Sequence, residues 1–160
     1  MAIAVGDRIP DVKVYTFGEK GPEATTSGAV LGTGKVVLFA VPGAFTPTCS
    51  DHHLPGFVFR GEELRAKGVD QVVCVSVNDA FVMEAWAKSQ DVGDSVLMMA
   101  DGNGEFAEAM GLVMDGSGFG LGSRSQRYAA VIEDGVVTWL GVEPGPGLNA
   151  SSAEEVLAAL

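Results

Sequence analysis

Long hydrophobic runs are the first feature that this 160-residue sequence lacks. The longest nearly apolar stretch covers residues 36–45 and is interrupted by Pro42 and Gly43, whereas a membrane-spanning helix needs about 20 apolar residues. At the N-terminus no basic segment precedes an apolar block, which is the pattern of a secretory signal. We therefore expect a cytoplasmic protein that does not act on a membrane.

Basic residues are scarce as well. Lys and Arg total 10 against 21 Asp and Glu, which gives a formal net charge of −11. Such a surface repels phosphate backbones and anionic lipids, which argues against nucleic acid as a partner. A basic side chain beside a chemical site would therefore have a local purpose.

Cysteine is nearly absent, because the chain has only Cys49 and Cys74. A secreted scaffold held by disulfides carries more cysteines in a shorter chain. In a reducing cytoplasm both residues should be thiols. The simplest interpretation of each is a buried, unreactive side chain, since free cysteine is among the most buried residue types.

What the sequence does have is material for a folded core. Apolar residues make up 47% of the chain and charged residues 19%, and the length fits one domain over residues 1–160. Short continuous apolar runs predict buried strands at 35–41, 72–77 and 95–100. Residues 128–142 predict two strands around Asp134-Gly135, a strong hairpin signal.

Helical spacing predicts helices between these strands. They are expected at 50–67 with a kink at Pro55, at 79–89 with Asp79 as the cap, at 105–110, and in the C-terminal SSAEEVLAAL, where Ser151 with Glu154 or Ser152 with Glu155 forms a capping box. The glycine-rich segments 17–34, 115–122 and 141–147 are expected to be loops. Continuous apolar strands that alternate with helices indicate the α/β class, with a sheet covered on both faces.

Cys49 lies in the stretch VPGAFTPTCSDHHLPGF, directly after a predicted strand and at the start of a predicted helix. The thiolate is the reactive form of cysteine, and a helix N-terminus stabilises negative charge. The Thr46 hydroxyl can donate a hydrogen bond toward the sulfur or can simply cap the helix. Because Pro42 fixes the loop that leaves the strand, these residues together predict a reactive cysteine in a small pocket.

Two other chemistries are conceivable at Cys49. A metal site with His52 and His53 is chemically possible, but a fourth ligand at suitable spacing is missing and the metal would block the thiolate. A papain-like hydrolase needs a histidine base with an Asn or Asp partner, and both histidines lie on the helix of the cysteine itself. We therefore expect no metal and no hydrolytic triad.

The segment PGAFTPTC contains P-x-x-x-T-x-x-C, the active-site signature of peroxiredoxins, and its surroundings resemble the Prx5 (type II) branch. SVNDAFVMEAW, LMMADGNGEF, GSRSQRYA and the VEPGPGL segment resemble that branch in the same order, so the resemblance runs from about Val5 to the C-terminus. It implies a thioredoxin-like fold with a mixed central sheet flanked by helices and an N-terminal hairpin extension.

The resemblance also implies roles for four residues, and it implies that the reaction uses no cofactor. Cys49 would be the peroxidatic cysteine, which attacks a hydroperoxide and becomes a sulfenic acid. Thr46 would hydrogen-bond the peroxide, and Pro42 would shield the thiolate from water. Arg127 would place its cation at the sulfur and at the leaving oxygen, although a surface charge at a strand edge is the simpler interpretation of Arg127 taken alone.

Several neighbours of the motif receive simpler interpretations. Arg124 is a weaker second candidate for the site and is expected to be solvated or at the pocket rim. His53, which matches the histidine of the family's H-L-P-G-F, is expected to support the site through a hydrogen bond, and His52 is expected to be exposed. Asp101 is expected to form a turn.

The sulfenic acid must be reduced again, and here the sequence departs from part of the family. Animal members use a cysteine in the C-terminal loop, where this chain has Ala150. Cys74 matches a strand cysteine that is proposed to resolve in some relatives, but its apolar neighbours predict burial, and a disulfide needs Cα atoms within about 7 Å. An outside thiol is the better expectation, with glutathione and glutaredoxin first and thioredoxin second.

The resemblance implies a homodimer formed near the active-site loops, and exposed Phe45 and Phe119 would suit such a contact or a pocket rim. The expected activity is a thiol peroxidase acting on hydrogen peroxide and small alkyl hydroperoxides, in cell redox homeostasis and antioxidant defence. The alternative is a redox sensor or chaperone-like module that passes the oxidation of Cys49 to a partner protein.

Overall fold

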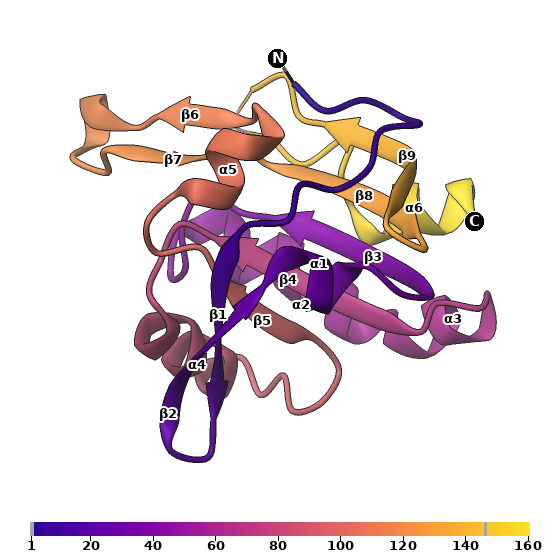
Figure 1. Ribbon diagram of the computed structural model, residues 1–160, viewed down its shortest axis with the longest axis horizontal. Coiled ribbons are helices and arrows are strands. Elements are labelled where there is room, and N and C mark those ends of the chain that lie inside the picture. Colours follow the sequence, from indigo (N-terminus) through magenta and orange to yellow (C-terminus); the bar gives the residue numbers. More distant parts are fainter. Residues whose placement is uncertain (1, 146) are drawn as a thin grey trace.

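The computed structural model describes residues 2–145 and 147–160. A mixed seven-stranded sheet forms its centre in the order β2-β1-β5-β4-β3-β8-β9, and a two-stranded arm projects from it (Figure 1). The strands of the sheet are β1 (Lys13–Gly18), β2 (Gly21–Thr26), β3 (Lys35–Ala40), β4 (Gln71–Ser76), β5 (Leu97–Ala100), β8 (Tyr128–Glu133) and β9 (Val136–Val142). The arm consists of β6 (Val113–Asp115) and β7 (Ser123–Ser125).

The helices lie between the strands, as the sequence predicts. They are α1 (Ser27–Leu31), the π-helical segment η1 (Cys49–His53), α2 (Leu54–Phe59), α3 (Gly61–Ala66), α4 (Ala80–Ser89), α5 (Glu105–Met110), the 3-10 turn η2 (Ser117–Phe119) and α6 (Ala153–Ala159). The Asp79 carboxylate accepts from the N–H of Val82 and caps α4, and the Ser152 hydroxyl accepts from the N–H of Glu155 and caps α6. The Asp79 cap agrees with the prediction, and of the two alternatives for the C-terminal helix the structure has Ser152 as the cap.

The three parallel strands are the apolar runs of the sequence. β3 pairs in parallel with β4, and β4 in parallel with β5, while β8 and β9 add antiparallel strands on the other side of β3. The β8–β9 hairpin turns at Asp134 and Gly135, whose φ angles are 49° and 84°. This is the left-handed pair of a tight hairpin, which Asp-Gly accommodates at low cost.

Two hydrophobic cores lie on the two faces of the sheet. Residues of η1, α2, α4 and α6 pack on one face, around Phe39, Phe57 and Trp86. Residues of α1 and α5 pack on the other, around Leu38, Phe106 and Tyr128. The predicted α/β class, with a mixed sheet flanked by helices and an N-terminal β1–β2 hairpin, is confirmed.

The predicted helix at 50–67 is wrong in its details. The helical segment begins at Pro47 and continues through the π-helical η1. It then divides into α2 and α3 at Arg60 and does not kink at Pro55. The N–H of Leu54 bonds to the carbonyl of Cys49, five residues back. Since Pro55 has no N–H and its ring collides with the preceding turn, the wider π-turn before it accommodates the proline inside the first turn of α2.

Two further expectations need correction. The glycine-rich segment 17–34 is not one loop, because it contains β2 and α1. Asp101 is not only a turn former, because its buried carboxylate accepts from the N–H groups of Phe106 and Ala107 and so caps α5. Burial raises the pKa of Asp101, although these two hydrogen bonds act in the opposite direction.

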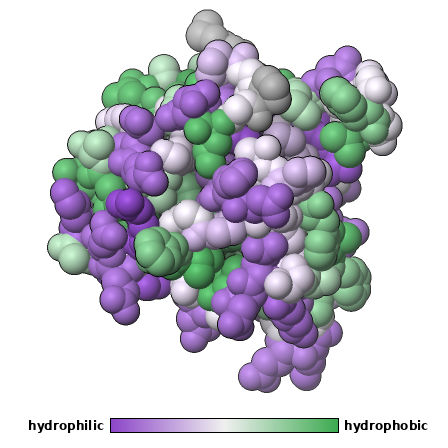
Figure 2. Space-filling view, turned by 180° about the vertical axis from the view of Figure 1, so that it is seen from behind, coloured by the Kyte–Doolittle hydropathy of each residue, from purple (hydrophilic) through white to green (hydrophobic). Residues whose placement is uncertain are grey.

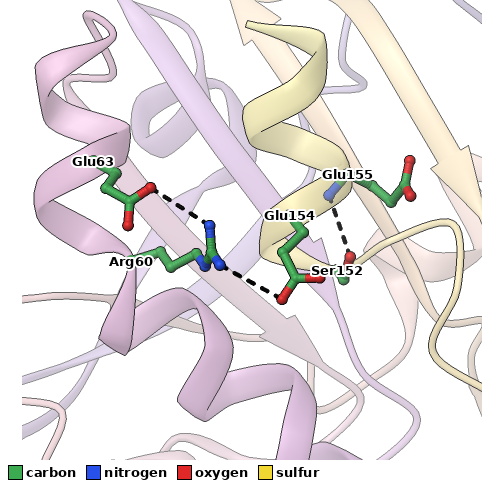
Figure 3. A network of polar contacts seen from close by, with 5 residues as sticks. All are labelled: Arg60, Glu63, Ser152, Glu154 and Glu155. Atoms are coloured by element: carbon green, nitrogen blue, oxygen red, sulfur yellow. Dashed lines mark hydrogen bonds and ion pairs between the residues drawn. The ribbon is translucent and has the colours of Figure 1, made fainter.

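The C-terminal helix is joined to the segment that follows η1. Figure 3 shows Arg60 between Glu63 and Glu154, with Nη–Oε distances of 3.5 and 3.8 Å, beside the Ser152 cap of α6. These partners are exposed, so the ion pairs contribute little to stability. In the described ranges, no helix has the length and apolar character that crossing a membrane requires.

Candidate active site

The loop after β3 brings the predicted motif to one end of the sheet. Asn78 follows β4, and its side-chain oxygen accepts from the N–H of Ala44 (3.0 Å) and from the hydroxyl of Ser76 (2.6 Å). Phe45 then takes a left-handed backbone with φ of 65°, an unfavourable conformation for a bulky residue. The neighbouring β4 loop therefore holds a strained turn directly before Thr46 and Cys49.

Cys49 is the first residue of η1, and its side chain is fully buried. Its Sγ atom lies 3.0 Å from Nη2 of Arg127, which comes from the residue before β8. Arg127 is itself 93% buried, since its relative exposure is 7%. The structure thus brings together two predicted residues that are 78 positions apart in the chain.

His53 lies on the same buried segment and holds the other side of the guanidinium. Its Nδ1 is 2.8 Å from Nη1 of Arg127, and its Nε2 is 2.8 Å from the carbonyl oxygen of Ser151. Because arginine can only donate and a carbonyl can only accept, the imidazole carries its proton on Nε2. Burial, together with the neighbouring cation of Arg127, lowers the pKa of His53 from 6.5 to about 3.

An open cavity of about 570 Å³ lies beside this cluster. Pro42, Thr46 and Arg127 form one wall of the cavity, and Val113, Phe119 and Leu121 from the β6–β7 arm line it as well. A molecule in the cavity would therefore meet both the guanidinium that contacts the sulfur and the apolar side chains of the arm.

The Thr46 hydroxyl donates to the carbonyl of Gly43 at 2.7 Å, so it is not used to cap the helix. Instead, the carbonyl of Thr46 accepts from the N–H of Ser50. The hydroxyl therefore neither donates to the sulfur nor caps the helix, the two roles expected from sequence; Thr46 lines the cavity, and its hydroxyl oxygen keeps lone pairs available as acceptors.

Arg124 is not simply solvated. It is half-buried, and it donates from Nε to the carbonyl of Leu121 (2.9 Å) and from Nη1 to the carbonyls of Val77 (3.3 Å) and Pro42 (3.4 Å). One cation therefore joins the β6–β7 arm, the loop after β4 and the loop that precedes Cys49. Arg124 lies at the rim of the site but contacts main chain, not sulfur.

Cys74 is fully buried in β4, opposite Phe39 of β3, and both cysteines are free thiols. Burial raises the pKa of the Cys74 thiol well above its ordinary value, and the nearby Cys49 adds to the effect. Its environment is therefore that of an inert core thiol.

The alternatives based on histidine do not fit this geometry. His52 is exposed, and no cluster of three possible metal ligands occurs in the parts of the chain that the structure describes. Both ring nitrogens of His53 already have partners, so His53 cannot accept a proton from Cys49 without breaking one of those contacts. A papain-like arrangement is therefore not built here.

Sequence reasoning missed three residues that hold the cluster. Asn78 positions the turn before Thr46, Ser151 provides the carbonyl for His53, and Glu143 is a buried carboxylate that binds the segment containing Ser151. Asn78 and Ser151 act largely through neighbours that are distant in sequence, so their local patterns give no signal. Glu143 precedes a proline- and glycine-rich segment, where a carboxylate usually faces solvent.

This geometry suits chemistry at sulfur. The guanidinium of Arg127 gives a fixed positive charge in direct contact with the buried Sγ of Cys49. The same guanidinium borders a cavity in which negative charge on an oxygen atom could be stabilised.

The Redoxin family matches residues 4–157 of the chain. Peroxiredoxin-2E-2, chloroplastic, from Oryza sativa subsp. japonica is 55% identical over 163 residues, covering 99% of this chain and 72% of that protein. Peroxiredoxin-2B from Arabidopsis thaliana is 48% identical over 159 residues, covering 99% and 98%. The crystal structure of reduced Prx3 in complex with H2O2 from Vibrio vulnificus has a TM-score of 0.94 and 49% identity, covering 98% of each chain.

Proposed function

Since this chain belongs to the Redoxin family, as a peroxiredoxin of the type II (Prx5) branch, we propose that Cys49 carries out its peroxidase reaction. The observation that carries the proposal is the 3.0 Å contact between Sγ of Cys49 and Nη2 of Arg127. That contact gives the buried sulfur of Cys49 a fixed positive charge as its neighbour. At Cys74, by contrast, burial and the nearby Cys49 both oppose ionisation of the thiol.

In the proposed reaction, the thiolate of Cys49 attacks one oxygen of a hydroperoxide, ROOH. A sulfur–oxygen bond forms while the oxygen–oxygen bond breaks, so the sulfur loses two electrons to the peroxide. The departing oxygen leaves as RO⁻ and takes up a proton to give an alcohol, or water when the substrate is hydrogen peroxide. Cys49 remains as a sulfenic acid.

Three residues that line the cavity would each support this reaction in a different way. Arg127 would stabilise both the attacking thiolate and the leaving oxygen, and its contact with the sulfur and its position at the cavity support this role. Because the Thr46 hydroxyl proton is engaged with Gly43, Thr46 would accept the peroxide O–H rather than donate to it. Pro42 offers no N–H and would keep one wall of the cavity free of competing donors.

The shape and lining of the cavity support the substrate class. Hydrogen peroxide needs only polar partners such as Thr46 and Arg127, whereas the side chains of Val113, Phe119 and Leu121 would contact a short alkyl group. We therefore assign hydrogen peroxide and small alkyl hydroperoxides to this site.

An outside thiol is the proposed reductant. Cys74 lies in the middle of a buried strand with its ionisation opposed, so it is poorly suited to attack the sulfenic acid. Glutathione with glutaredoxin is the first candidate and thioredoxin the second. Two free thiols in one chain suit the cytoplasm as the compartment, although the rice relative is described as chloroplastic.

A homodimer is the proposed assembly. Phe45 and Phe119 are 55% and 88% exposed, and Phe119 lines the cavity. Large apolar side chains that are this exposed suit contact with a second copy of the same surface.

Turnover assays test the function and the reductant together. With glutathione and glutaredoxin supplied, the wild-type protein should consume hydrogen peroxide continuously, Cys49→Ser should be inactive, and Cys74→Ser should keep most of the activity. If Cys74→Ser were as inactive as Cys49→Ser, the assignment of an outside thiol would be wrong. A single stoichiometric oxidation without recycling would instead favour the redox sensor or chaperone-like module.

A further inference from the structure

The Glu143 carboxylate is an unusual feature at the end of β9. It is only 6% exposed, and it accepts hydrogen bonds from four donors on the segment before α6. The N–H of Asn149 contacts both oxygens at 3.0 and 2.9 Å, and Oε2 also accepts from the N–H of Ala150 (2.7 Å) and from the N–H (2.7 Å) and hydroxyl (2.6 Å) of Ser151. The carboxylate therefore fixes residues 149–151 in one conformation.

A continuous chain of contacts leads from this segment to the reactive sulfur. The Ser151 carbonyl accepts from Nε2 of His53, and Nδ1 of His53 accepts from Nη1 of Arg127. Arg127 then donates from Nη2 to Sγ of Cys49. A backbone hydrogen bond also joins the two ends of this chain of contacts, because the N–H of Glu143 donates to the carbonyl of Arg127 at 2.9 Å.

The electrostatics keep Glu143 in the form that this chain requires. Burial opposes its ionisation, but the Ser151 hydroxyl and the three backbone N–H groups outweigh that effect and hold the pKa of Glu143 below its ordinary value. An ionised carboxylate can only accept hydrogen bonds, so every partner must present a donor. The backbone N–H groups of the segment consequently point to Glu143, while the Ser151 carbonyl is left for His53.

We propose that Glu143 is a positioning residue for the reaction at Cys49, because it holds the Ser151 carbonyl that fixes the tautomer of His53 and thereby the guanidinium of Arg127 on the sulfur. The inference rests on the proposed function of Cys49. Without a carbonyl at Nε2, the neutral imidazole can move its proton to Nδ1, where an N–H would face the N–H of Arg127. Two donors repel each other, and the guanidinium would leave Sγ.

The test compares Glu143→Gln with Glu155→Gln, a matched change of an exposed carboxylate on α6. Glu143→Gln keeps one acceptor oxygen but turns the other into a donor and removes the charge, so the charge-assisted hydrogen bonds to Asn149, Ala150 and Ser151 weaken and the segment is released. Since the chain has two histidines, the ¹⁵N resonances of the His53 imidazole can be assigned and report its tautomer directly. We expect Glu143→Gln to lose the pure Nε2–H form and to react with hydrogen peroxide about tenfold more slowly, which corresponds to about 1.4 kcal/mol. Glu155→Gln should match the wild type in both readouts.

A folded Glu143→Gln with an unchanged His53 tautomer and an unchanged peroxide rate would overturn the inference. If that variant does not fold, Glu143→Asp keeps the charge on a shorter side chain, and the same two readouts should move in the same direction by a smaller amount. The proposed function fails separately, when Cys49 of the wild-type protein does not react with peroxide at all.

Discussion

At the scale of single residues, the geometry of the site depends on the contacts of Arg127. Its guanidinium bridges Sγ of Cys49 and Nδ1 of His53, so one side chain joins the sulfur that we propose as the reacting atom to the imidazole beside it. The planar fork of arginine matches two acceptors at once, which the point charge of lysine does not. Because His53 and Cys49 already hold the guanidinium, the Arg127 side chain would not have to be ordered during the proposed reaction.

Arg127→Ala should weaken the reactivity of Cys49 at neutral pH. Loss of the cation removes the positive charge in contact with Sγ, so the rate at which iodoacetamide alkylates Cys49 at neutral pH should fall. The rate constant for hydrogen peroxide should fall by roughly 100-fold, as for other losses of a charge-stabilising donor. Arg65→Ala removes an exposed arginine from α3 and serves as the control. An unchanged alkylation rate would remove Arg127 from the site.

At the scale of elements, the π-helical η1 connects the site to the C-terminal region. It carries Cys49 at its first position and His53 at its last, and both side chains are buried. Ser50, between them, accepts from the indole N–H of Trp86 in α4 at 3.0 Å. η1 is therefore held by α4, by β8 through Arg127, and by the segment before α6 through Ser151.

The buried neutral state of His53 predicts a pH dependence of stability. Its pKa is lowered from 6.5 to about 3, so between these values the unfolded chain binds a proton that the folded chain does not. Stability should therefore fall as the pH drops below about 6.5, and this residue should account for about 2 kcal/mol between about pH 7 and pH 5. Urea denaturation at several pH values measures the slope.

The two adjacent histidines provide a matched comparison for this measurement. His53→Gln should flatten the slope above about pH 5, where few carboxylates titrate, whereas His52→Gln, at an exposed position, should leave it unchanged. A slope that survives in His53→Gln would mean that another group causes the pH dependence.

The sequence predicts the elements well where local pattern decides them. The apolar runs became β3, β4 and β5, the Asp134-Gly135 turn formed its hairpin, and residues 105–110 form α5 as expected. The division of the helix at 50–67 was not predicted, because Pro55 can be accommodated either by a kink or by a wider turn before it. Tertiary packing around Cys49 and His53 decides between them.

At the scale of the whole molecule, the order of strands creates the site. β8 lies antiparallel beside β3, so the residue before β8 arrives at the end of β3 where the cysteine loop begins. Sequence alone could place Cys49, Thr46 and Pro42 together, since they share one loop. Arg127 needed the family resemblance, and Glu143 and Ser151 needed the fold, because their partners lie far away in the chain.

The projecting arm and the opening of the cavity give the molecule an apolar surface. Figure 2 shows hydrophobic residues on the arm at the upper right, and the exposed large side chains there are Val113 and Phe119. Burying such side chains against a second copy is favourable by about 25 cal/mol per Å² of apolar area. The cavity wall contributed by Phe119 would then lie close to the interface.

Phe119→Ser should therefore weaken the proposed homodimer. Sedimentation equilibrium should give a dissociation constant raised about tenfold or more, because an exposed phenyl ring that becomes buried on association contributes at least 1.4 kcal/mol. Phe59→Ser changes a phenylalanine that is 85% exposed on α2 and should leave association unchanged. Wild-type protein that is monomeric at micromolar concentration would contradict the assembly.

The most direct test of the account is to find which sulfur receives oxygen. The reduced protein is treated with one equivalent of hydrogen peroxide in the presence of dimedone, which traps sulfenic acids, and the peptides are analysed by mass spectrometry. We predict one dimedone adduct per chain on the peptide that contains Cys49, and an unmodified thiol at Cys74. An adduct on Cys74, or a Cys49 thiol that survives the treatment unmodified, would contradict the central claim that Cys49 is the reacting residue.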